Sequence, residues 1–284
     1  MKKMGILYIC TGPYVLFWED FYKSFEKNFL PNTKKQYYVF TDADKIYGEG
    51  NENITKYNLK NLPWPLITLF RFDTFLSIKD DLLDCDYLMF SNANMVCSAL
   101  VTEEEFLPQK NKNETLFFTE HPGYFNKHKK DVPYDRNKKS LAYIPYNKGE
   151  HYVIGALFGG ETSEFLKMSE ILKKRIEEDL KKNIIARWHD ESHINRYIIN
   201  KKNIKFLSPS YCYPVGFDLN LDRKISGVSK QDKFDVKTFK GQYDKKENRY
   251  FRKLKQFIKN IVNKNTVLFI IDSLLFKNIN EVVD

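Results

Sequence analysis

Short apolar runs alternate with amphipathic segments along most of the 284-residue chain. The spacing of aromatic and aliphatic residues predicts helices at 18–29 and 69–78. Buried strands are predicted at 6–9, 37–40, 54–59, 87–90 and 116–119. Strands that alternate with helices in this way predict an α/β fold with a mostly parallel central sheet.

A second apolar block, at 152–160, is rich in glycine and precedes a long charged helix that ends near Leu180. Thr162 or Ser163 is the expected N-cap of that helix. The glycines either let the backbone approach a ligand closely or belong to an ordinary strand and turn.

The strand at 87–90 ends in Ser91, Asn92, Ala93 and Asn94. Ligands of open α/β sheets bind at the carboxyl ends of the strands, where two amides can hydrogen-bond a sugar or a phosphate. A polar turn is the alternative interpretation. Neither G-x-G-x-x-G nor a P-loop lysine motif occurs, so the sequence signals no dinucleotide or ATP cradle.

The densest cluster of ionisable side chains is Trp188-His189-Asp190-Glu191-Ser192-His193. His189 and His193 would share a helical face, as zinc ligands do, but Asp190 stands where the zinc protease pattern needs Glu. Helix capping by Asp190 or Ser192 is a second interpretation. Glu191 as a catalytic carboxylate is the third, because glycosyl transfer passes through an oxocarbenium-like state.

Composition favours a folded protein of a reducing compartment. Hydrophobic residues make up 42% of the chain, and its four cysteines include no C-x-x-C pair. No apolar run reaches the roughly 18 residues of a transmembrane helix, and the short N-terminal apolar run lacks a small-residue cleavage site. We therefore expect a cytoplasmic protein.

The net charge of +9 is concentrated near the C-terminus. Beyond the expected domain at 1–232, the tail at 233–284 contains a basic amphipathic segment at 249–262. This pattern is typical of helices on an anionic membrane surface, here the inner face of the cell membrane. Docking on the protein's own core or on a second subunit is the alternative. A nucleic-acid partner is not expected, because no RRM, KH or helix-turn-helix signature accompanies the basic residues.

Six segments of the chain form a recognisable series: YYVFTD at 37–42, HPGYF at 121–125, AYIP at 142–145, GALFGG at 155–160, WHDESHIN at 188–195 and LSP at 207–209. Together they resemble glycosyltransferase family six, which includes the histo-blood-group A and B transferases and the α-1,3-galactosyltransferase. The segments occur in family order with similar spacing, over roughly residues 4 to 232.

The resemblance implies a GT-A fold and retaining transfer of galactose or N-acetylgalactosamine from a UDP donor. The acceptor is the 3-OH of a β-galactoside, which is fucosylated in blood-group-like glycans. By position, the residues implied for donor binding are Ile9, Cys10, Thr11, Tyr14, Arg71, Asn92, Ala93, Asn94, Ile154, Gly155, Ala156, Asp190 and Lys230. Those implied at the acceptor are His121, Trp188 and Glu191, and Glu191 also matches the proposed nucleophile or front-face stabiliser.

Asn92-Ala93-Asn94 departs from the Asp-x-Asp with which animal members bind Mn²⁺. Hard divalent cations prefer anionic oxygen, so the neutral amides resemble the bacterial branch that works without metal. We therefore expect no metal cofactor, and lysine and arginine in its place at the UDP leaving group. Ala156 resembles the galactose-using members, which favours UDP-galactose.

Three rival functions remain open on the sequence alone. A metal-dependent hydrolase would use His189, Glu191 and His193. A protein with this fold could also bind carbohydrate without catalysis, although the intact 188–193 block argues against this. The basic tail could bind nucleic acid non-specifically.

Overall fold

The computed structural model describes residues 1–236. The amphipathic helix predicted at 249–262, and the membrane-surface hypothesis that depends on it, lie outside the described residues. Within 1–236, every helix is too short or too polar to traverse a lipid bilayer. The last described residues still contact the domain, since the Phe234 ring lies 5.5 Å from that of Tyr14.

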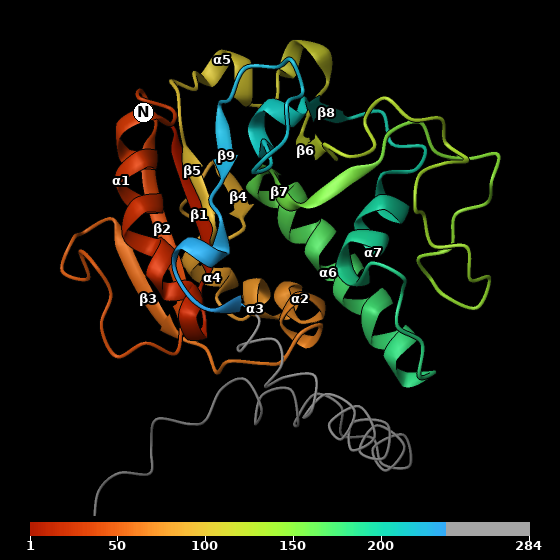
Figure 1. Cartoon of the computed structure of the whole chain (residues 1–284), viewed down its shortest axis with the longest axis horizontal. Helices are drawn as coiled ribbons and strands as arrows, with labels where there is room; N and C mark the ends of the chain where they lie inside the picture. Colours follow the sequence, from red (N-terminus) through yellow and green to blue (C-terminus); the bar gives the residue numbers. More distant parts are fainter. Residues whose placement is uncertain (237–284) are drawn as a thin grey trace, which may run out of the picture.

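A seven-stranded sheet with the order β3-β2-β1-β4-β7-β6-β8 forms the centre of the molecule (Figure 1). Its strands are β1 (Lys3–Ile9), β2 (Lys34–Thr41), β3 (Ile54–Asn58), β4 (Tyr87–Ser91), β6 (Leu116–Glu120), β7 (Val153–Glu161) and β8 (Ile204–Leu207). Neighbours run parallel, except that β7 is antiparallel to both β4 and β6. The predicted α/β fold and mostly parallel sheet are confirmed, and the architecture is consistent with GT-A.

Helices cover both faces of this sheet. The longer ones are α1 (Trp18–Asn28), α6 (Thr162–Lys181) and α7 (His189–Ile198). Short α-helices are α2 (Leu66–Leu69), α3 (Arg71–Leu76), α4 (Lys79–Leu82) and α5 (Glu103–Phe106), and 3-10 turns occupy Gly12–Phe17, Lys110–Lys112, Pro209–Cys212 and Lys230–Asp232. A separate antiparallel ribbon pairs β5 (Met95–Cys97) with β9 (Ile225–Gly227).

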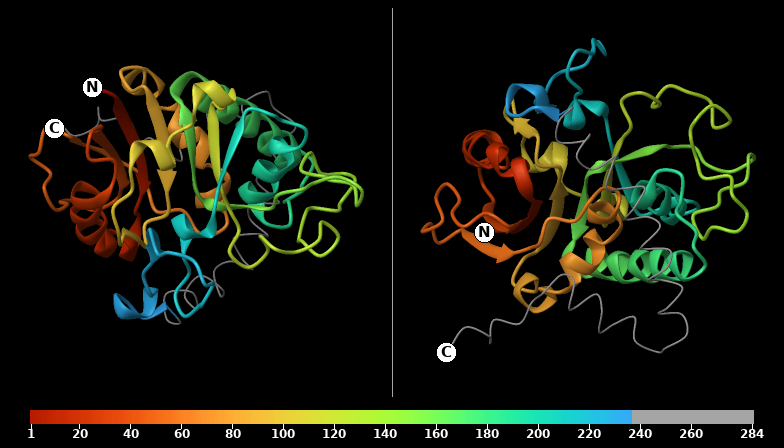
Figure 2. Two further views of the ribbon diagram at one scale, coloured as in Figure 1. Left: turned by 90° about the horizontal axis from the view of Figure 1, so that it is seen from above. Right: turned by 60° about the horizontal axis from the view of Figure 1, so that its bottom comes forward.

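Alternation along the strands divides the core into two clusters. On β1, Ile6 and Tyr8 belong to the cluster under α1, whereas Leu7 belongs to the cluster under α3 and α6. Successive strand side chains point to opposite faces, so this division follows from the strand geometry. Figure 2 shows α1 and α6 far apart on the molecule, with the sheet between them.

The helix predicted at 69–78 is interrupted. Phe70, with φ −93° and ψ 9°, separates α2 from α3 and leaves Arg71 as the first residue of α3. The predicted N-cap of α6 is wrong: Thr162 is the first helical residue, and its hydroxyl donates to the Cys85 carbonyl at 2.5 Å instead.

The segment between β6 and β7 is a long excursion on the side away from α1 (Figures 1 and 2). It is anchored by its own small cluster, in which Tyr134 packs against Tyr152 with ring centroids 5.3 Å apart. Asp135, which is buried, accepts the Arg187 N–H at 2.8 Å. This segment is therefore tied to the body of the domain.

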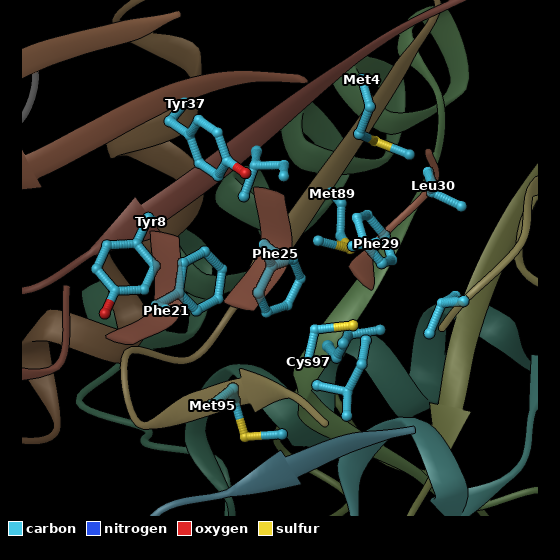
Figure 3. Packing of buried hydrophobic residues seen from close by; sticks show 14 of the residues in the cluster. Met4, Tyr8, Phe21, Phe25, Phe29, Leu30, Tyr37, Met89, Met95 and Cys97 are labelled. Atoms are coloured by element: carbon cyan, nitrogen blue, oxygen red, sulfur yellow. The ribbon is translucent and has the colours of Figure 1, made fainter. Parts of the chain in front are cut away.

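Phe21 and Phe25 of α1 pack against the sheet, and Figure 3 shows them beside Tyr8 of β1. Phe21 and Phe25 stack at 4.0 Å, and Tyr8 lies 4.4 Å from Phe21. All three are fully buried. The amphipathic helix predicted at 18–29 is confirmed, because its apolar stripe is the face that packs on the sheet.

We predict that Phe25→Ala lowers the free energy of unfolding by about 3–5 kcal/mol, because it leaves a cavity in a close-packed aromatic cluster. Urea unfolding followed by circular dichroism measures the loss. Leu83→Ala is the control, since Leu83 is 60% exposed and should change stability little. Equal losses in the two variants would contradict the assignment of this cluster as the core.

Candidate functional site

A cavity of about 740 Å³ opens at the carboxyl ends of β1 and β4, between α3, β7 and the start of α7. The donor-site and acceptor-site residues implied by the family resemblance line it, except Cys10. They are Ile9, Thr11, Tyr14, Arg71, Asn92, Ala93, Asn94, His121, Ile154, Gly155, Ala156, Trp188, Asp190, Glu191 and Lys230. Cys10 lies fully buried in the core, so its side chain is separated from the cavity.

Asn94 connects the end of β4 to the C-terminal part of the domain. Its side-chain amide donates to the Val228 carbonyl at 2.9 Å, and the Val228 N–H donates to the Asn94 carbonyl at 2.8 Å. Two residues later, the Lys230 ammonium lies 5.1 Å from the centre of the Tyr14 ring. Asn94 therefore lines the cavity and also holds the segment that brings Lys230 to it.

Arg71 and Asp190 form a buried ion pair beside the cavity. The Arg71 guanidinium lies 2.9 Å from the Asp190 carboxylate, donates to the Gly155 carbonyl at 2.6 Å and stacks over the Phe90 ring at 4.2 Å. Burial lowers the pKa of Arg71 and raises that of Asp190, and the attraction between the two charges opposes both shifts. Much of the Arg71 charge is thus compensated by Asp190.

Glu191 presents a carboxylate held by two donors. The Tyr152 hydroxyl donates to Oε1 at 2.7 Å, and the Gly155 N–H donates to Oε2 at 2.9 Å. Burial raises the pKa of Glu191 to about 7, although these two hydrogen bonds favour the charged form. The carboxylate consequently titrates near neutral pH, as a group in an active site often does.

Gly155 permits the close approach of β7 to α7. A Cβ at this position would lie 3.3 Å from the Glu191 Cβ and 3.4 Å from Asp190 Oδ2, tighter than most such contacts. The close approach that Gly155 permits here is that of a neighbouring helix, and approach of a ligand to this glycine stays a prediction.

Aromatic side chains also line the cavity, among them Trp64, Trp188 and His121. Trp188 is 42% exposed and Trp64 is 55% exposed, and the ring of His189 meets Trp64 at 4.4 Å. His121 Nδ1 accepts the Gly123 N–H at 3.0 Å, and burial lowers the pKa of His121 to about 4. The neutral imidazole therefore carries its proton on Nε2 and can donate from there.

Sequence reasoning missed Trp64 and Asn61, which also line the cavity. Trp64 stands between two prolines, and this pattern gave no signal beyond a turn. Asn61 accepts the Thr11 hydroxyl at 3.2 Å, a contact between residues 50 positions apart that local patterns do not reveal.

The metal site of the hydrolase alternative is not formed. His193 is buried 3.8 Å from Asp179, whereas Glu191 contacts Tyr152, and His189 contacts Trp64. In residues 1–236, no three His, Cys, Asp or Glu side chains are grouped to hold a metal ion.

The capping interpretation of the 188–193 block is also corrected. Helix α7 begins at His189, so Asp190 and Ser192 lie inside it, and the N-cap residue is Trp188, whose side chain makes no capping hydrogen bond. Ser192 instead accepts the Trp188 N–H at 2.9 Å from within the helix.

The fold and the cavity are those expected of a nucleotide-sugar-dependent transferase, and comparison with known proteins agrees. The model of glycosyltransferase family 6 matches residues 2–236. The chain belongs to this family, which implies a nucleotide-sugar donor and a glycan acceptor.

Relatives occur in bacteria and animals. The chain is 38% identical to the O-antigen biosynthesis glycosyltransferase WbnI of Escherichia coli, over 78% of this chain and 92% of that protein. It is 30% identical to the histo-blood group ABO system transferase 2 of Rattus norvegicus and to the globoside alpha-1,3-N-acetylgalactosaminyltransferase 1 of Gallus gallus. These two matches cover 74% of this chain but only 63% and 61% of the animal proteins.

The raised pKa of Glu191 predicts how the stability of a Glu191→Gln variant depends on pH. A carboxyl whose folded pKa is raised contributes stability as the neutral form, and this contribution is lost as the pH rises through about 7. Glutamine stays neutral, so the melting temperature of the variant should rise relative to that of the wild type as the pH increases from 5 to 8. Glu19→Gln, at a half-exposed position on α1, is the matched control. A pH-independent difference for Glu191→Gln would contradict the prediction.

Proposed function

We propose that the protein is a retaining glycosyltransferase that moves galactose, or N-acetylgalactosamine, from a UDP donor to the 3-OH of a β-galactoside without a metal. The observation that carries the proposal is the pair Asp190 and Glu191 at the start of α7, which both line the cavity that Asn92 also lines. Asp190 would hydrogen-bond the transferred sugar, and Glu191 would stabilise positive charge at its anomeric carbon.

The reaction breaks the bond between the anomeric carbon and the UDP oxygen, and the bonding electrons leave with UDP. The acceptor O3 forms the new bond on the same face of the sugar, and its proton passes to the departing phosphate. Glu191 either forms a covalent glycosyl intermediate or stabilises the oxocarbenium ion, and both roles require its carboxylate form.

Lys230 is the cation that we assign to the UDP leaving group. Arg71 is less suited to this role than its sequence position suggests, because its charge is paired with Asp190. Lys230 lines the cavity with its ammonium over the Tyr14 ring, and a cation there would stabilise charge that develops on the diphosphate.

His121 and Trp188 are assigned to the acceptor. Both line the cavity, and the exposed Trp188 ring offers an apolar face to a sugar. The relative WbnI is named for O-antigen biosynthesis, and the family includes blood-group transferases, so we propose a fucosylated galactoside in a bacterial surface glycan, extended in the cytoplasm.

The first test is product formation in excess EDTA from UDP-galactose and UDP-N-acetylgalactosamine, with lactose and 2′-fucosyllactose as acceptors. We expect transfer with α-1,3 linkage and retained activity without metal. Complete loss of activity that Mn²⁺ restores would overturn the metal-free mechanism but not the enzyme class. No transfer under either condition would favour a carbohydrate-binding protein without catalysis.

Ala156 is the expected determinant of donor choice. It is buried at the cavity wall, where its methyl group limits the room for a 2-acetamido substituent. We expect Ala156→Gly to raise the ratio of kcat/KM for UDP-N-acetylgalactosamine over UDP-galactose about 10- to 100-fold. Ala142→Gly, at a buried alanine that is not among the cavity-lining residues, is the control. An unchanged ratio in Ala156→Gly would assign donor choice to other residues.

A further inference from the structure

Strand β7 is irregular where it passes the site. Phe118 of β6 pairs with Phe158 of β7, and Glu120 of β6 pairs with Val153 of β7. An advance of two residues along β6 therefore corresponds to five residues along β7. Gly155 lies inside this interruption. Its N–H and C=O bind the Glu191 and Arg71 side chains at 2.9 Å and 2.6 Å rather than another strand. Bulges of this kind are common next to active sites, where they redirect the chain.

Asn195 of α7 binds the backbone of Val153, the residue of β7 at which pairing with β6 resumes. Asn195 is fully buried and lies one helical turn after Glu191 on α7. Its amide donates to the Val153 carbonyl at 2.8 Å, and its Oδ1 accepts the Val153 N–H at 3.0 Å. The same amide donates to the Glu191 carbonyl at 2.9 Å. One side chain thus pairs with both peptide groups of a strand residue, as a neighbouring strand would.

The two donors to the Glu191 carboxylate come from residues on either side of Val153. Tyr152 precedes it and Gly155 follows two residues later. Fixing Val153 against α7 therefore fixes both donors relative to the helix that carries Glu191. Without this link, the interrupted part of β7 could shift with respect to α7.

We propose that Asn195 is a positioning residue of the transfer reaction, which holds β7 against α7 so that Tyr152 and Gly155 keep the Glu191 carboxylate in its reactive orientation. The inference rests on the proposed function, because it assigns the role through Glu191. Asn195 is not among the residues that line the cavity, and although it ends the WHDESHIN segment at 188–195, the resemblance implies no role for it.

The pH dependence of activity is the readout, so the other charged groups around Glu191 matter. Asp190 shares α7 with it, Arg71 faces it from α3, and the Cys212 thiol approaches from the 3-10 turn Pro209–Cys212. Burial raises the pKa of Cys212 to about 12, and burial raises the pKa of Tyr152 well above its usual range. Both groups stay neutral near pH 7, so the acid limb of the profile is set by the carboxyl groups of Glu191 and Asp190, and Tyr152 donates to that of Glu191.

The first experiment compares Tyr152→Phe with Tyr134→Phe in the full-length chain. Tyr134 packs against Tyr152, but its hydroxyl donates to the His151 carbonyl, so it is a matched control. Removing a donor to the carboxylate should move the acid midpoint of kcat/KM upward by about one pH unit in Tyr152→Phe. The profile of Tyr134→Phe should keep the wild-type midpoint.

The second experiment is a double-mutant cycle of Asn195→Ala with Glu191→Gln. Asn195→Ala should lower kcat about 10- to 100-fold, raise the acid midpoint, and leave KM for the donor nearly unchanged. In the Glu191→Gln background the same change should have little further effect on kcat, because the group that it positions is gone. Ser169→Ala, which removes a buried hydroxyl from α6, controls for general destabilisation.

A purely structural Asn195 would lower the melting temperature and the active fraction, without moving the midpoint, and its effect on kcat would add to that of Glu191→Gln. That result would overturn the proposal. Failure of the proposed function is recognised separately, as absence of transfer by the wild type. The Glu191 pKa is then read from the pH dependence of the stability difference between the wild type and Glu191→Gln, and Asn195→Ala and Tyr152→Phe should still raise it.

Discussion

Two adjacent carboxylates, Asp190 and Glu191, impose the main constraint on this domain. Burying a charge in a protein costs free energy unless the charge is paired or hydrogen-bonded. The surrounding structure supplies partners for both: Arg71 for Asp190, and the Tyr152 hydroxyl with the Gly155 N–H for Glu191. The break before α3 and the interruption of β7 are the irregularities that bring these partners to the start of α7.

The two carboxylates differ because their partners differ. Asp190 faces a full positive charge, whereas Glu191 has only neutral donors in direct contact. For both groups burial raises the pKa, and for Glu191 it reaches about 7. The first arrangement suits a group that must accept hydrogen bonds from a substrate, and the second suits one that responds to charge at a reacting carbon.

Features of the fold and the site could be predicted from the sequence where they depend on neighbouring residues, and could not where they depend on contacts between distant segments. Local periodicity identified α1, α6 and the strands β1, β2, β3, β4 and β6, because burial leaves a regular pattern in the sequence. The family resemblance identified most of the residues that line the cavity but not Trp64 or Asn61, and it included Cys10, which is buried in the core. The antiparallel direction of β7 and the break at Phe70 depend on packing between distant segments. Likewise, Arg71 and Gly155 are 84 positions apart and Asn94 and Val228 are 134 apart, so no local pattern encodes these contacts.

The Asn94–Val228 contact bears on the metal-free proposal. A carboxamide can donate an N–H to the Val228 carbonyl, whereas an ionised aspartate at the same position has no donor and would repel that carbonyl. Under the metal-free proposal, asparagine in place of aspartate would remove a metal ligand and add a link to the segment that carries Lys230. Asn94 in place of aspartate would then account for two features: the lost affinity for a divalent cation, and the approach of the Lys230 ammonium to the diphosphate. Lys230 would then depend on Asn94 for its position, as Glu191 depends on Asn195.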